Sequence, residues 1–143
     1  MNRTFFLTVL CALAWLSGGQ ASAAEAYLRK SQAALAGGLY LQALEQAEAA
    51  YEAGVQPGAA AFVMARAADL GNMAKGRTEQ LYLTALDHAQ DKAPVLGHLT
   101  VFYLQTGQTG KAAQSKAAFT ALCRYNCSGF THQFRAMTAN RRR

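Results

Sequence analysis

Glycine residues divide this chain into short segments, and most of the segments carry apolar side chains at helical spacing. Alanine is abundant, only two of the 143 residues are proline, and few stretches alternate apolar with polar residues. Apolar residues three or four positions apart form one face of a helix, so the pattern predicts an all-α fold. The glycines predict where the helices end, because glycine adopts the left-handed conformation of a helix terminus at low cost.

Seven helices are expected from this punctuation. The last one carries Phe130, Phe134 and Met137 on a single apolar stripe, at positions i, i+4 and i+7. Glycine or proline separates most of the segments, as at Gly37-Gly38 and Pro94. The expected ranges are Ala26–Ala36, Leu39–Ala53, Ala59–Leu70, Arg77–Gln90, Val95–Thr106, Gly110–Arg124 and Phe130–Ala139.

An internal period underlies this segmentation. The run that begins at Gly38 has the form G-x-Y-x-x-A, and the run that begins at Gly107 has the form G-x-T-x-x-A. Gly71 lies between them, at spacings of 33 and 36 residues. A period of 20 to 50 residues indicates repeated supersecondary units, each of which buries its apolar face only by stacking on its neighbours.

With this period and these residues, the chain resembles the tetratricopeptide repeat family, whose helix pairs recur about every 34 residues. Gly38, Tyr40 and Ala43 match the glycine, aromatic and alanine of the repeat, and Pro57 lies where a proline separates two repeats. The later unit matches at three positions, and the middle unit departs from the pattern at two. The matches are Gly107, Ala112 and Phe119; the departures are Met73 and Gly76.

The resemblance implies a right-handed solenoid of helical hairpins. We expect about three helix pairs within residues 24–127, followed by a capping helix and a basic tail over residues 128–143. It also implies a non-enzymatic protein–protein interaction module that holds an unidentified protein or peptide in the groove lined by the first helix of each pair. The candidate groove residues are Phe62, Arg66 and Thr100.

The N-terminus has the order of a secretory signal peptide. Arg3 supplies a positive charge, residues 5–16 form an apolar run, and Ala21-Ser22-Ala23 is a small-x-small cleavage site. The run is shorter than the roughly 20 residues of a spanning helix, which disfavours a retained anchor. We therefore expect cleavage after Ala23, export to the periplasm or an equivalent space, and a mature chain without a transmembrane segment.

Two cysteines follow the expected cleavage site, Cys123 and Cys127. An even number of cysteines in an exported chain indicates a disulfide. A redox motif is usually C-x-x-C, whereas three residues intervene here, and zinc would need two further ligands. We expect a structural disulfide that joins the sixth helix to the cap, and we expect neither a metal nor a cofactor.

Charge is distributed unevenly along the mature chain. Residues 24–91 contain all eight acidic residues and five basic ones, a net charge of −3. Residues 92–143 contain eight basic residues and no acidic one, a net charge of +8. The candidate anionic-partner patch is Arg135 with Arg141, Arg142 and Arg143. An alternative function is therefore a basic structural protein that docks on anionic cell-wall or lipid surfaces. Nucleic acid is not expected as a partner outside the cytoplasm, and a solubilising tail remains the simpler interpretation.

Motifs of catalysis are weak in this chain. The carboxylates precede Lys92, and Glu45, Glu48 and Glu52 are spaced as one solvated helix face. His88 and His98 lie on either side of Pro94, and surface positions are the simpler interpretation of both. The sequence contains neither G-x-S-x-G nor H-E-x-x-H, so we expect a binding protein rather than an enzyme.

Overall fold

A computed structural model describes residues 23–125 and 127–140, and every regular element among them is an α-helix. The all-α prediction is confirmed for this part of the chain. Nearly all of the expected signal peptide, and Arg141, Arg142 and Arg143 of the candidate patch, lie outside the described residues. Within the described ranges, none of the helices has the length and hydropathy needed to cross a membrane.

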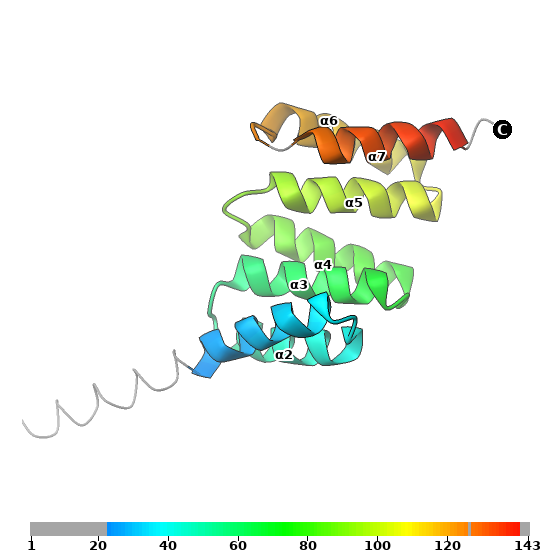
Figure 1. The fold of residues 1–143 in the computed structure, drawn as a ribbon. Helices are drawn as coiled ribbons and strands as arrows, with labels where there is room; N and C mark the ends of the chain where they lie inside the picture. The colour runs from blue at the N-terminus through cyan, green and yellow to red at the C-terminus, as the bar shows by residue number, and fades with distance from the viewer. Residues whose placement is uncertain (1–22, 126, 141–143) are drawn as a thin grey trace, which may run out of the picture.

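The helices follow one another in chain order from one end of a stack to the other (Figure 1). The prolines lie within the first turns of α3 and α5, where proline lacks only an N–H that the helix does not use. These two helices therefore begin two residues before the expected starts. A helix over residues 23–36 is followed by α2 (Tyr40–Glu52), α3 (Pro57–Leu70), α4 (Lys75–His88), α5 (Ala93–Thr106), α6 (Thr109–Leu122) and α7 (Cys127–Asn140).

Four helix–helix turns share one hydrogen-bond pattern. Gly38, Gly54, Asn72 and Gly107 each have a positive φ, and each donates its N–H to the carbonyl three residues before it. The following residue in each turn donates to the carbonyl five residues before it, which is the longer bond of a helix-ending Schellman motif. Three of these residues, Gly38, Asn72 and Gly107, are 34 and 35 residues apart, and Gly54 lies between the first two. In the turn between α3 and α4 the left-handed residue is Asn72, because Gly71 has a φ of −80°.

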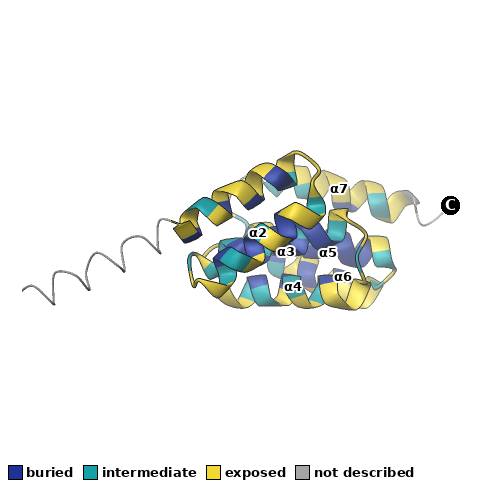
Figure 2. Cartoon of the chain, turned by 90° about the horizontal axis from the view of Figure 1, so that it is seen from below, coloured by how far each residue is buried: buried dark blue, intermediate teal, exposed yellow. Residues whose placement is uncertain are grey.

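The core consists of two apolar clusters that share α3. One cluster joins α2 and α3 to the helix over residues 23–36, and the other joins α3 and α4 to α5, α6 and α7. Alanines 60, 61, 65, 67 and 68 of α3 are fully buried, so neighbouring helices approach its backbone from two sides. Buried residues accordingly lie where the helices face each other, and exposed ones on the outer sides (Figure 2).

The last helix, α7, packs mainly on α5 through aromatic side chains. Phe134 is 1% exposed, and its ring centroid lies 5.5 Å from that of Phe119 and 6.0 Å from that of Phe130. A Cβ atom on Gly97 of α5 would lie 2.7 Å from the ring of Phe130, so glycine permits this close approach. The apolar stripe predicted for the last helix thus packs against the core.

A disulfide joins Cys123 to Cys127 at the junction between α6 and α7. The two residues do not lie in one continuous helix, because α6 ends at Leu122 and Cys123 has an extended backbone conformation. Cys127 is the first residue of α7, so the bond links the end of one helix to the start of the next. The expected pairing is present in the structure.

A polar network on α4, α5 and α6 links the second half of the stack. Glu79 accepts hydrogen bonds from the hydroxyl of Tyr103, at 2.9 Å, and from the ammonium group of Lys111. The hydrogen bond from Lys111 lowers the pKa of the Glu79 carboxyl, whereas burial raises the pKa of Tyr103. The ammonium of Lys111 also lies 5.5 Å from the ring centroid of Tyr103. The positive charge of Lys111, one of the basic residues after Asp91, is therefore paired with Glu79 within the fold.

Candidate functional site

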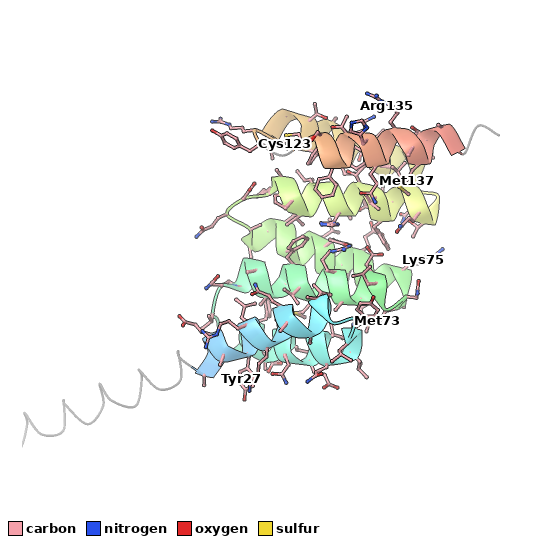
Figure 3. All side chains as sticks on the ribbon, in the orientation of Figure 1. Tyr27, Met73, Lys75, Cys123, Arg135 and Met137 are labelled. Carbon is pink, nitrogen blue, oxygen red and sulfur yellow. A yellow bond between two sulfur atoms is a disulfide. The ribbon has the colours of Figure 1, made fainter. Side chains whose placement is uncertain are left out.

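A hollow with a volume of about 660 Å³ lies along α3, the start of α4, α5 and α7. Its walls are mixed: aliphatic and aromatic side chains alternate with amides and charged groups. Figure 3 shows two of the lining residues, Met73 and Lys75, near the turn between α3 and α4. We call this hollow the groove. Its lining residues are Arg66, Asp69, Leu70, Asn72, Met73, Lys75, Thr78, His98, Val101, Phe102, Gln105, Thr106 and Gln133.

A fixed carboxylate lies in the wall of the groove. Asp69 accepts a hydrogen bond of 2.9 Å from the hydroxyl of Tyr82 and lies 3.5 Å from the guanidinium of Arg66. Tyr82 is fully buried on α4, and this burial raises the pKa of its hydroxyl. The hydroxyl therefore stays protonated and holds Asp69 in place, while Arg66 keeps further N–H groups for a ligand.

His98 of α5 lies between two phenylalanines from neighbouring helices. Its ring centroid lies 5.5 Å from that of Phe62 on α3 and 4.9 Å from that of Phe130 on α7. Burial, with a smaller contribution from the charge of Arg66, lowers the pKa of the imidazole to about 4. His98 is therefore neutral at pH 7 and acts as an aromatic contact that connects three helices at the floor of the groove.

Only one of the three candidate groove residues lines the groove. Arg66 does, whereas Phe62 contacts His98 and lines an adjacent hollow of about 440 Å³ at the starts of α3 and α5. Thr100 is fully buried, and its hydroxyl lies 2.8 Å from the Leu96 carbonyl and 2.7 Å from the Ser115 hydroxyl. Thr100 therefore does not line the groove, because its buried side chain faces α6.

The turns at Gly38, Asn72 and Gly107 relate the positions of the preceding helices to one another. Seven residues before these three turn residues stand Ser31, Ala65 and Thr100, and all three are fully buried. The same register places Arg66 with Val101 and Leu70 with Gln105, which all line the groove. A surface position was the simpler interpretation of His98 from sequence, because its two aromatic neighbours are distant in the chain.

Of the candidate anionic-partner patch, only Arg135 lies among the described residues. Its side chain is exposed on α7 and points away from the stack (Figure 3). No group of three or more His, Cys, Asp or Glu side chains in residues 23–125 and 127–140 is arranged to hold a metal ion. The groove thus offers hydrogen-bonding amides, one cation–carboxylate pair and apolar surface.

Stability should decrease between pH 6.5 and pH 4 because of His98. Its pKa is about 4 in the folded chain and 6.5 in an unfolded peptide, so the unfolded chain binds more protons in this range. Urea unfolding at pH 7.5, 5.5 and 4.5 should show this decrease, and it should be smaller in His98→Gln. His132→Gln is the matched control, because His132 is exposed on α7. An equal pH dependence in His98→Gln and the wild type would contradict the assignment.

Comparisons with known proteins give no family. No protein-family model matches the chain, and neither a curated protein nor a solved structure is significantly similar to it. A function for the chain must therefore be inferred from the groove and the turns.

Proposed function

We propose that this chain is an exported, non-enzymatic interaction module of the tetratricopeptide type, and that the groove holds a segment of a partner protein. Of the four turns with the same hydrogen bonds, those at Gly38, Asn72 and Gly107 are 34 and 35 residues apart, and this period supports a right-handed solenoid of about three hairpins. In this architecture α7 is the cap, and the disulfide fixes where it starts.

The single observation that carries the proposal is the composition of the groove. Successive first helices contribute equivalent positions to it, as Leu70 and Gln105 do. An extended peptide needs partners for its backbone groups and pockets for its side chains. Gln105 and Gln133 are exposed amides suited to the backbone, while Val101 and Phe102 form apolar floor. The secretory pattern of the N-terminal residues supports an interaction in the periplasm or an equivalent compartment.

A photo-crosslinker placed in the groove tests the proposal. With benzoylphenylalanine at Gln105, irradiation of the native envelope should join the chain to one or a few defined proteins. The same group at Gln114, exposed on α6 and outside the groove, should give no such product. Arg66→Glu should reduce the yield at Gln105, because it reverses the charge beside Asp69. No protein adduct, or equal adducts at both positions, would overturn the proposal.

The alternative, a basic protein docked on an anionic surface, rests on the charge of residues 92–143. Such binding depends on exposed charges and is screened by salt within about 10 Å at 0.1 M. Arg135→Glu together with deletion of Arg141 to Arg143 should abolish sedimentation with anionic vesicles if this alternative holds. Crosslinking at Gln105 should be unaffected by the same changes if the groove is the functional site.

A further inference from the structure

Another, smaller hollow lies between α5, α6 and α7. We call it the end crevice; its volume is about 330 Å³. α7 packs mainly on α5 and meets α6 at Phe119, whose ring contacts Phe130 and Phe134. Met137 lies on the side of α7 that faces α5 (Figure 3). The crevice is lined by Thr100, Leu104, Thr109, Ala112, Ala113, Lys116, Phe134, Met137 and Thr138.

Two cations lie at this end of the stack. Lys116 belongs to the lining of the end crevice, and Arg135 projects outward from α7 (Figure 3). Both side chains are exposed, and neither forms a salt bridge within residues 23–125 and 127–140. The sequence contains no acidic residue after Asp91 to offset them. The crevice therefore combines a largely apolar lining with the positive charge of Lys116, and Arg135 adds a second positive charge to this end of the stack.

The exposed face of α2 has the complementary character. Leu41 is 65% exposed, and Leu39, immediately before the helix, is 57% exposed. Glu45, Glu48 and Glu52 are exposed on the same stripe as Leu41, at positions i+4, i+7 and i+11. No salt bridge is formed by these glutamates in the described part of the chain. The stripe is thus an apolar knob followed by a row of negative charges.

We propose that the α2 stripe of one copy docks in the end crevice of a second copy. Leu41 enters the crevice beside Phe134 and Met137, and the glutamates lie against Lys116 and Arg135. The two surfaces are different patches of one chain, so the contact is heterologous and joins copies head to tail. This contact involves no residue that lines the groove, so the result of its test does not depend on the proposed peptide binding.

Charge complementarity favours a second copy as the occupant. The acidic residues and the α2 stripe lie before Lys92, and the crevice with Lys116 and Arg135 lies after it. A knob on one surface and a matching pocket elsewhere on the same molecule produce open chains of copies unless the geometry closes a ring. Opposite charges on the two surfaces also favour this head-to-tail orientation over head-to-head contact.

Complementation between two variants tests the proposal. The form that accumulates in cells expressing all 143 residues is purified, and mass spectrometry identifies its N-terminus. In sedimentation velocity, the wild type should grow from monomer to dimer and larger species with concentration. The association constant should fall by about tenfold or more between roughly 50 mM and 500 mM salt. Leu41→Glu blocks the stripe and Ala113→Glu blocks the crevice, and each variant alone should be monomeric.

Mixing the two variants is the decisive experiment. Each retains one intact surface, so an equimolar mixture should form a 1:1 dimer that does not grow further. Leu83→Glu on α4 is the matched control: Leu83 is 44% exposed and outside both surfaces, and this variant should associate as the wild type does. Circular dichroism checks that all variants keep their helices. Monomeric wild type, unaffected association in Leu41→Glu, or a mixture that stays monomeric would each overturn the proposal. Monomers that sediment with anionic vesicles through Lys116 would assign this end to a lipid surface instead.

Discussion

Phe134→Ala should lower the free energy of unfolding by about 3–5 kcal/mol, the usual cost of removing a fully buried phenylalanine. The ring is 1% exposed and packs between Phe119 of α6 and Phe130 of α7. Its loss leaves a cavity where α7 packs against α5 and against Phe119 of α6. Much of the destabilisation should therefore appear as release of α7 before the rest of the chain unfolds.

Urea unfolding measures the total effect, and hydrogen exchange resolves its location. Amides of α7 should exchange faster in Phe134→Ala, while those of α3 should change much less at low denaturant. His132→Ala is the control on the same helix, because that side chain is exposed, and its stability should change little. A loss below about 1 kcal/mol, or unchanged protection of α7, would show that Phe134 does not hold the helix.

Gly58→Ala should destabilise the chain by about 1–3 kcal/mol or prevent the α3–α4 packing described above. A Cβ atom at this position would lie 2.5 Å from the His88 carbonyl oxygen and 2.9 Å from the Ala89 Cα atom. These are backbone atoms at the end of α4, so no side-chain rotation relieves the overlap. The start of α3 and the end of α4 would have to separate.

Two other helical glycines provide matched controls. A Cβ atom at Gly76 of α4 or Gly110 of α6 meets no atom within 4 Å. Alanine is the better helix former, so Gly76→Ala and Gly110→Ala should leave stability unchanged or raise it by up to about 1 kcal/mol. Thermal unfolding of the three variants, side by side, separates helix propensity from steric overlap. A Gly58→Ala chain as stable as the controls would contradict the close approach.

Much of the architecture is predictable from the sequence because local signals agree with the final packing. Helical spacing and glycine breaks predict the described helices, and the stripe of Phe130, Phe134 and Met137 predicts the buried face of α7. The helix ends are less predictable. Pro57 is the first residue of α3, whereas the helix was expected to begin at Ala59. Proline is compatible both with a break before a helix and with the first turn of a helix, so the sequence alone does not decide between the two starts.

The candidate site was harder to predict, since it depends on contacts between distant segments. Phe62, Arg66 and Thr100 were named together because one sequence does not show which face of a helix is turned inward. The structure places Arg66 in the groove and Thr100 against Ser115 of α6. The packing of His98 between Phe62 and Phe130 required the stacking of three helices to be known.

α3 contributes residues to both apolar clusters, and this affects how the chain unfolds. Arrays of repeated hairpins can unravel from one end, because each unit contacts only its neighbours. Here a single alanine-rich helix contributes to the core on both of its sides, so neither cluster keeps its packing once α3 is lost. Fraying is therefore confined to the two terminal helices, and the segment between them behaves as one cooperative block whose small side chains leave little room for substitution.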